Sequence, residues 1–218
     1  MCYRQFIKEF MKILICDDHK IVRDGLRQIL QQVQGEIIIA EAGDADEALA
    51  LLKKDTFDIL LLDISLPGRN GLEVLQLVKE KWPSTNVLIL SMQPQELFAL
   101  RALKLGASGY LTKDAAMEEL LIAVKRVSEG EKYISPSVEA FLVQQLVDNK
   151  PSQKHNALSN REYDIMIRLA NGKSLLEIGH ELAISNKTVG TYRTRIMEKM
   201  ELTKNIELTW YCMENKLI

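Results

Sequence analysis

The stretch Phe57-Asp58-Ile59-Leu60-Leu61-Leu62-Asp63 decides the fold class of this chain. Its apolar core, residues 59–62, lies between two aspartates. Such a continuous apolar run is typical of a strand that is buried on both faces of a parallel sheet. Because ligands of open α/β sheets bind outside the carboxyl ends of the strands, the aspartate that ends this strand predicts a binding site there.

Strand-like and helical patterns alternate on both sides of this segment. The predicted strands cover residues 12–16, 36–40, 57–62, 87–90 and 109–111, and the predicted helices cover about 20–33, 44–54, 72–82, 95–105 and 114–129. Five strands that alternate with five helices predict a doubly wound, five-stranded parallel sheet of the α/β class with right-handed crossovers. We expect this first domain to span residues 11–130.

The rest of the chain has a different pattern. Residues 131–157 contain two prolines, a short amphipathic stretch and a polar run, which we interpret as a linker with one short helix. In residues 158–218, Ser159 and Ser174 are each followed three residues later by a glutamate, which is the pattern of a capping box at a helix start. Helices are predicted at about 160–172, 175–183, 186–200 and 204–215, with Ser185 capping the third. The middle pair predicts a helix-turn-helix unit in an all-α domain.

The composition excludes several classes of protein. The 218 residues include 28 basic and 30 acidic side chains and 47% hydrophobic residues, which rules out a disordered chain, a collagen and a disulfide-rich miniprotein. The apolar runs are too short to span a bilayer, so we expect no membrane partner. Three scattered cysteines, Cys2, Cys16 and Cys212, favour the reducing cytoplasm. Residues 155–218 carry nine basic and eight acidic side chains, so net charge alone does not indicate nucleic-acid binding.

Polar side chains follow the ends of four predicted strands. Asp17 and Asp18 follow the first strand, Asp63 the third, Ser91 the fourth and Lys113 the fifth. Any one of them has a simpler explanation as a turn former or a solvated side chain, but the ordered set favours a shared site. Converging carboxylates suit Mg²⁺, and a lysine and a hydroxyl suit phosphoryl oxygens. Asp63 follows the most buried strand, and we interpret it as a carboxylate nucleophile.

These residues lie in segments that resemble the receiver domain of bacterial response regulators. The segments are CDDH at 16–19, LDISLPGRNG at 62–71, LSM at 90–92 and GASGYLTK at 106–113. Residues 158–218 resemble the LuxR-type helix-turn-helix domain, through LSNRE at 158–162 and NKTV at 186–189. Together the two parts are similar to the NarL/FixJ family of transcriptional regulators.

The resemblance implies a phosphoryl-transfer mechanism. A sensor histidine kinase would supply the phosphoryl group, and the receiver would catalyse only its own phosphorylation at Asp63 and its dephosphorylation. The protein is therefore expected to be a transcription regulator and not an enzyme. The resemblance also implies Mg²⁺ ligation by Asp18 and Asp63 directly, by Asp17 through water, and by the backbone carbonyl of Ser65.

The resemblance further implies a conformational switch. Ser91 and Lys113 would bind the phosphoryl oxygens, and the movement of Ser91 would let Tyr110 swing inward. The alternative for Tyr110 is an amphipathic residue at the rim of the domain. His19 follows the acidic pair, and we interpret it as a loop residue at the rim of the site and not as a metal ligand.

The predicted helix 186–200 is the candidate DNA-reading element. Val189, Ile196 and Met200 recur at helical spacing and should face the core, which turns the opposite side outward. We predict that this side enters the major groove of double-stranded DNA, although a solvated basic helix face is the alternative. The candidate contacts are Lys187, Thr188, Gly190, Thr191, Tyr192, Thr194, Arg195 and Lys199. Gly190 stands where many family members carry a long side chain.

The low charge of the second domain predicts weak DNA binding by a monomer and therefore a homodimer on pseudo-palindromic DNA. The family commonly dimerises through its last helix, which corresponds here to residues 204–215. The candidate residues are Ile206, Leu208, Trp210, Tyr211 and Met213, and a core position is the alternative for Trp210.

Three other functions are compatible with parts of the pattern. A Mg²⁺-dependent phosphatase of the haloacid-dehalogenase type would need a second aspartate at the position of Ser65. A flavodoxin-like module would need a phosphate loop where the acidic pair Asp17-Asp18 stands. A DNA-binding regulator that works without phosphate would not need the complete acidic site.

Overall fold

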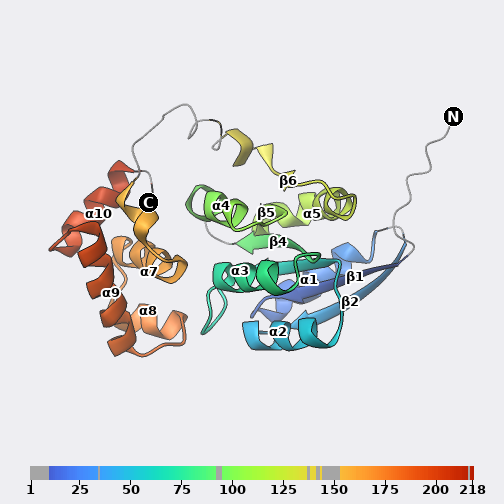
Figure 1. The fold of residues 1–218 in the computed structure, drawn as a ribbon, viewed down its shortest axis with the longest axis horizontal. Helices are drawn as coiled ribbons and strands as arrows, with labels where there is room; N and C mark the ends of the chain where they lie inside the picture. Colours follow the sequence, from blue (N-terminus) through green and yellow to red (C-terminus); the bar gives the residue numbers. More distant parts are fainter. Residues whose placement is uncertain are drawn as a thin grey trace.

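The chain forms a parallel α/β domain and a helical domain (Figure 1). The structure is a computed structural model that describes residues 10–33, 35–91, 95–136, 138–140, 143, 153–215 and 217–218. For residues 95–97 and 114–118 it describes the backbone and not the side chains. None of the helices in the described ranges is long and apolar enough to cross a bilayer.

The α/β domain contains one parallel sheet with the strand order β2-β1-β3-β4-β5-β6. The strands are β1 (Phe10–Cys16), β2 (Glu36–Ala42), β3 (Ile59–Asp63), β4 (Asn86–Ser91), β5 (Gly109–Thr112) and β6 (Tyr133–Ile134). All five residues of β3 are buried, as its apolar run predicts. The predicted doubly wound α/β architecture is confirmed.

The sheet has one strand more than the five predicted, because β6 lies in the segment interpreted as a linker. The backbone N–H of Tyr133 donates to the carbonyl of Ser108 at 2.9 Å, and β6 pairs in parallel with β5. A strand of two residues is too short to show an alternating pattern in the sequence. The short helix predicted around residues 141–147 lies mostly outside the described residues, but the backbone described at 136, 138–140 and 143 is helical.

Helices cover both faces of the sheet. They are α1 (Lys20–Leu30), α2 (Ala45–Lys54), α3 (Gly71–Lys81), α4 (Gln95–Lys104) and α5 (Lys113–Ser128). Leu60 and Leu62 of β3 belong to the core on the side of α2, α3 and α4. Ile59 and Leu61 belong to the core on the side of α1 and α5. The alternation along β3 therefore fills two hydrophobic cores and leaves the strand ends for the site.

The helical domain contains a 3₁₀ turn, η1 (Lys154–Ala157), and the helices α7 (Asn160–Ala170), α8 (Leu175–Glu181), α9 (Asn186–Met200) and α10 (Asn205–Glu214). Both predicted capping boxes are present, at Ser159 and at Ser174. The Ser185 side chain accepts a hydrogen bond from the backbone N–H of Thr188 at 3.0 Å, so the third predicted cap is also confirmed.

The turn between α8 and α9 depends on close backbone approach. A Cβ at Gly179 would lie 2.8 Å from the carbonyl oxygen of Ile184 and 2.9 Å from Oδ1 of Asn186. Ala183, within the turn, has a left-handed backbone with φ of +50°. Only glycine at position 179 lets the two helices come this close, so the helix-turn-helix geometry rests on it.

The helical domain contacts the loop between β3 and α3, residues 64–70. The backbone N–H of Gly68 donates to the carbonyl of Leu182 at 3.1 Å, and Arg161 Nη2 donates to the carbonyl of Gly68 at 3.1 Å. Asn70 Nδ2 donates to Asp164 Oδ2 at 3.4 Å. The loop that follows Asp63 thus touches α7 and the turn of the helix-turn-helix.

A second set of contacts joins α4 to the helical domain. Arg101 donates to the carbonyls of Leu158 at 3.0 Å and His155 at 2.5 Å, and its guanidinium lies 3.9 Å from the ring centroid of Tyr163. The rings of Phe98 and Tyr163 meet edge to face at 5.6 Å. Burial, with Arg101 adding to it, lowers the pKa of His155 to about 4. We call the two sets of contacts the interdomain contact.

Candidate functional site

The carboxyl ends of the strands bring a lysine between two carboxylates. Lys113 Nζ, at the start of α5, lies 2.6 Å from Asp17 Oδ2 and 2.8 Å from Asp63 Oδ2. Asp17 directly follows β1, and Asp63 ends β3. The register of the parallel strands therefore brings three of the predicted site residues together at one edge of the sheet.

Burial controls the charges of this group. Asp17 and Asp63 are 0% and 1% exposed. Burial raises the pKa of Asp63 above its usual range, although Lys113 acts in the opposite direction. Burial disfavours the charged form of Lys113, but Asp63 and Asp17 outweigh this effect, and the pKa of Lys113 is raised. The site therefore holds a charged ammonium beside a carboxylate that is poorly solvated.

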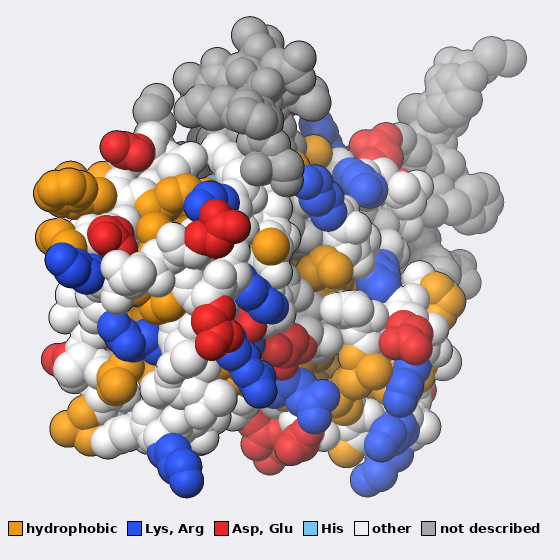
Figure 2. All heavy atoms as spheres, turned by 60° about the vertical axis from the view of Figure 1, so that its left-hand side comes forward, with side chains coloured by type: hydrophobic (Ala, Val, Ile, Leu, Met, Phe, Trp, Pro, Cys, Tyr) orange, Lys and Arg blue, Asp and Glu red, His pale blue; other side chains and the backbone are white. Residues whose placement is uncertain are grey.

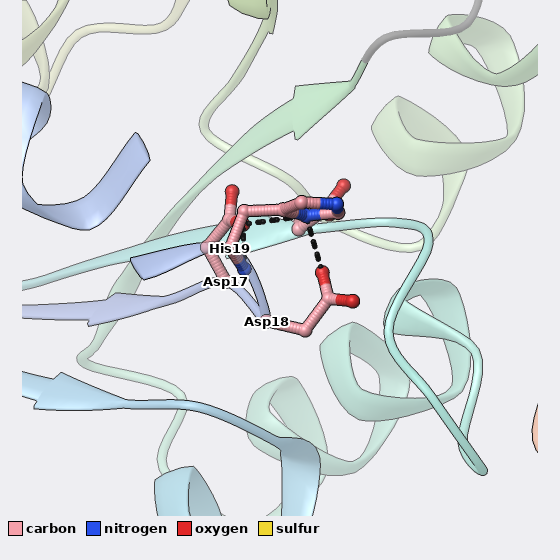
Figure 3. A group of neighbouring side chains, drawn as sticks. Asp17, Asp18 and His19 are labelled. Carbon is pink, nitrogen blue, oxygen red and sulfur yellow. Dashed lines mark hydrogen bonds and ion pairs between the residues drawn. The ribbon is translucent and has the colours of Figure 1, made fainter. Parts of the chain in front are cut away.

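Asp18 and His19 form the exposed side of the site (Figure 3). His19 Nδ1 lies 2.8 Å from Asp18 Oδ1 and 3.4 Å from Asp17 Oδ1. The imidazole of His19 is 64% exposed, so its predicted place at the rim of the site is confirmed. One ligand atom from each of Asp17, Asp18, His19 and Asp63 lies within 4.8 Å of the others.

The donor set fits a hard divalent cation. The site holds three carboxylates against one ammonium, and oxygen ligands in a partly open site are those that Mg²⁺ prefers. The backbone N–H of Ser65 donates to Asp63 Oδ1 at 3.1 Å, which keeps residue 65 next to the central carboxylate. Asp17, Asp18, Asp63 and the carbonyl of Ser65 are thus the residues that could hold the ion.

Ser91 and Tyr110 lie deeper than a rim position would allow. Ser91 ends β4, is 0% exposed and stands opposite Thr112 in the register with β5. Tyr110 is 1% exposed and belongs to the hydrophobic core that includes Phe98. The burial of Tyr110 contradicts the rim alternative, and its inward swing on phosphorylation stays a prediction.

The predicted division of α9 into two sides is confirmed. Val189, Ile196 and Met200 are each 0% exposed. The candidate DNA contacts that are exposed are Lys187, Thr188, Thr191, Thr194, Arg195 and Lys199, and Gly190 is half-buried among them.

Two candidate contacts on α9 are engaged within the domain. Lys199 Nζ lies 2.6 Å from Oε2 of Glu162, the glutamate of the first capping box. Tyr192 packs against the hydrophobic core. The Lys199 pair was not predicted, because its two members are 37 positions apart in the sequence. Both side chains have less freedom to reach DNA than predicted from the sequence.

The last helix presents an apolar stripe. Ile206, Trp210 and Met213 are 54%, 63% and 60% exposed, and their spacing places them on one side of α10. The core alternative for Trp210 is therefore wrong. Leu208 is buried, and the hydroxyl of Tyr211 lies 3.0 Å from His155 Nδ1, so these two residues stabilise the domain itself.

Comparisons with known proteins agree with this geometry. Residues 13–125 match the family model of the response regulator receiver domain, and residues 156–212 match that of bacterial regulatory proteins of the luxR family. The chain is 32% identical to the response regulator GacA of Pseudomonas aeruginosa, over 95% of this chain and 98% of that protein. It is 36% identical to the oxygen regulatory protein NreC of Staphylococcus haemolyticus, over 95% and 99% of the two chains.

A solved structure is similar over both domains. RcsB of Salmonella enterica serovar Typhimurium, bound to promoter P1flhDC with a phosphomimetic, is 27% identical, with a TM-score of 0.59 over 92% of this chain and 97% of that one. This chain belongs to the NarL/FixJ family of response regulators. It is a transcription-regulating response regulator with a receiver and a LuxR-type DNA-binding domain, and the phosphatase alternative finds no support.

The residues of the interdomain contact were not predicted from the sequence. Arg161 and Asp164 are 3% and 4% exposed, and the Arg101 side chain spans both domains. Charged residues normally lie at the surface, so the sequence carries no signal that these are buried.

Proposed function

We propose that Asp63 accepts a phosphoryl group from a phosphohistidine of a sensor histidine kinase, and that this modification controls the binding of α9 to double-stranded DNA. The observation that carries the proposal is the Lys113 ammonium, which lies within 2.8 Å of both buried carboxylates. A cation in this position can move from a carboxylate to a phosphoryl oxygen without leaving the site.

The transfer uses the chain's own residues in defined roles. A carboxylate oxygen of Asp63 forms a bond to phosphorus as the bond from phosphorus to the kinase's histidine breaks, and the imidazole leaves with that electron pair. Lys113 and the hydroxyl of Ser91 bind phosphoryl oxygens. Water attack on the acyl phosphate would later release phosphate, so the receiver would catalyse its own phosphorylation and dephosphorylation and no other reaction.

The acidic group also suits a resident Mg²⁺. Asp18 and Asp63 would hold it directly, Asp17 through water and Ser65 through its backbone carbonyl. When bound, the ion neutralises negative charge that develops on the phosphoryl oxygens. The reduced cysteines Cys16 and Cys212 fit a cytoplasmic protein.

The DNA-bound form would be a homodimer. Ile206, Trp210 and Met213 form an exposed apolar stripe that a second copy can cover. The similar protein RcsB has been solved bound to a promoter. Basic and acidic side chains are mixed over the face that the helical domain turns outward in Figure 2. One copy would therefore bind DNA without a strongly charged patch on this face, and a second copy would add avidity.

The chemical step is tested with the intact protein, acetyl phosphate and Mg²⁺. We expect mass spectrometry to detect one added phosphoryl group in the wild type and none in Asp63→Asn. Asp58→Asn is a matched control at the other end of the same strand, where Asp58 accepts a hydrogen bond from the backbone N–H of Lys12 at 2.9 Å. A stable phosphoryl adduct in Asp63→Asn would refute the assignment.

A further inference from the structure

The outward side of α9 carries two threonines and a glycine beside the exposed cations Lys187 and Arg195. Lys187, Gly190, Thr191 and Thr194 occur at helical spacing on this side, opposite the buried Val189. What these residues can offer to a base pair determines which bases the helix distinguishes, so this inference rests on the proposed DNA-binding function of α9.

The hydroxyl groups of both threonines are bonded to the helix itself. Thr191 Oγ1 donates to the carbonyl of Lys187 at 3.0 Å, and Thr194 Oγ1 donates to the carbonyl of Gly190 at 3.2 Å. Each hydroxyl has one proton, and that proton is used within the helix. Both residues are exposed, so the methyl group of each is the part that remains for an apolar contact.

Gly190, one residue before Thr191 and four before Thr194, is not required by the packing of the domain. A Cβ there would meet, among the described residues outside its own helix backbone, only Leu175 Cδ1 at 4.0 Å. Gly179 differs, because the packing of the turn excludes a side chain at that position. Glycine is among the least favourable residues inside a helix. A benefit that arises only when the domain binds DNA would explain why a glycine stands at a position with room for a side chain.

The cations of α9 are also partly engaged. Arg193 Nε donates to Asn205 Oδ1 at 2.8 Å, and Lys199 pairs with Glu162. Lys187 and Arg195 are exposed cations of the helix, and Lys199 is exposed as well although it is paired. This helix therefore offers few unpaired cations to DNA phosphates. Its choice between base pairs depends more on the residues of the turn that carries Gly190, Thr191 and Thr194.

We propose that α9 reads thymine methyl groups: the methyl groups of Thr191 and Thr194, with the bare backbone of Gly190 next to them, form a low apolar surface that contacts the C5-methyl groups of thymines in the major groove. Threonine methyl groups make such contacts, and the missing side chain at position 190 lets the helix approach the bases closely. The half-sites would then carry thymines opposite this turn.

The first test uses a duplex that the phosphorylated full-length protein selects from a random library. Each thymine of that duplex is replaced in turn by deoxyuridine, which differs only by the methyl group. We expect one or two positions per half-site to lose about fourfold in affinity each, the value for burial of one methyl-sized group. Replacing guanines by 7-deazaguanine, which removes the N7 acceptor, should weaken binding less.

The second test assigns the contact to Thr191. Thr191→Ser keeps the hydroxyl and removes the methyl, whereas Thr191→Val keeps a methyl and removes the hydroxyl. We expect Thr191→Ser to lose more affinity than Thr191→Val, and we expect the sensitive deoxyuridine to cost less in Thr191→Ser than in the wild type. The reverse order of the two variants would overturn the proposal in favour of hydroxyl readout.

A third variant tests the role of the bare backbone. Gly190→Ala should raise the thermal midpoint of the helical domain and weaken binding to the selected duplex. Gly25→Ala is the matched control, since a Cβ at Gly25 in α1 would meet no described atom within 4 Å outside its own helix. It should change stability alone. If the wild type selects no duplex, the proposed DNA-binding function fails; if it binds a duplex in which every uracil substitution is silent, only the methyl readout fails.

Discussion

Lys113 is the residue on which the chemistry of the site depends most. Its ammonium lies between two carboxylates that are almost fully buried, at 2.6 and 2.8 Å. Without it, Asp17 and Asp63 would face each other unpaired, and burial of an unpaired charge is unfavourable. In the proposed mechanism the same ammonium would bind a phosphoryl oxygen, so one side chain would stabilise the site before transfer and hold the phosphoryl group after it.

Replacing Lys113 by glutamine should therefore slow phosphorylation by acetyl phosphate. Loss of one preorganised donor at a reacting oxygen typically reduces a rate by about 10². The time course is measured by intact-mass spectrometry. Lys12→Gln is the control, because Lys12 pairs with Asp55 at 2.6 Å near the opposite edge of the sheet. Equal rates in the wild type and Lys113→Gln would contradict the role of this lysine.

At the scale of elements, local signals predicted the structure well. The apolar run at 59–62 predicted β3, and the serine–glutamate pairs predicted the starts of α7 and α8. Each of these signals lies within a few residues, so its physical cause is visible in the sequence. Asp17, Asp63 and Lys113 were predicted to meet because parallel strands end at one edge.

Several other features that depend on distant partners were not predicted. The strand β6 forms because the backbone N–H of Tyr133 donates to the carbonyl of Ser108, which lies 25 positions earlier in the chain. Tyr110 is buried in a core that also contains Phe98 of α4, and the Lys199–Glu162 pair joins two helices. Such contacts are decided by tertiary packing, which periodicity and spacing do not encode.

The turn between α8 and α9 gives an element-scale prediction. Gly179→Ala should destabilise the helical domain by about 1–3 kcal/mol, because the new Cβ would lie 2.8 Å from the carbonyl oxygen of Ile184. Gly190→Ala, in the next helix, should instead stabilise it by up to about 1 kcal/mol. Urea unfolding followed by circular dichroism measures both. A Gly179→Ala protein as stable as the wild type would show that the turn can relax.

At the scale of the whole molecule, the receiver holds the helical domain by the loop that follows Asp63 and by α4 (Figure 1). The exposed candidate contacts of α9 remain exposed in this arrangement. The interdomain contact therefore does not bury those side chains. It joins the helical domain to residues 64–70, the loop that follows Asp63, and we propose that a change at Asp63 reaches the helical domain through this loop.

Arg101→Ala, a substitution in the receiver, should weaken the interdomain contact. It removes the hydrogen bonds to His155 and Leu158 and the stacking on Tyr163 without changing the helical domain itself. We expect a larger radius of gyration by small-angle X-ray scattering. Lys104→Ala, which changes an exposed residue of the same helix, should leave the radius as it is. An unchanged radius of gyration in Arg101→Ala would mean that the contacts of residues 64–70 are sufficient to hold the two domains together.

We propose that phosphorylation of Asp63 controls DNA binding. It is tested most directly by measuring the Kd for one selected duplex with the full-length protein, before and after treatment with acetyl phosphate and Mg²⁺. We expect treatment of the wild type to tighten binding about tenfold or more, because pairing of two copies adds avidity, and we expect no change in Asp63→Asn. Equal Kd values for the treated and untreated wild type, with the phosphoryl group present by mass, would contradict it.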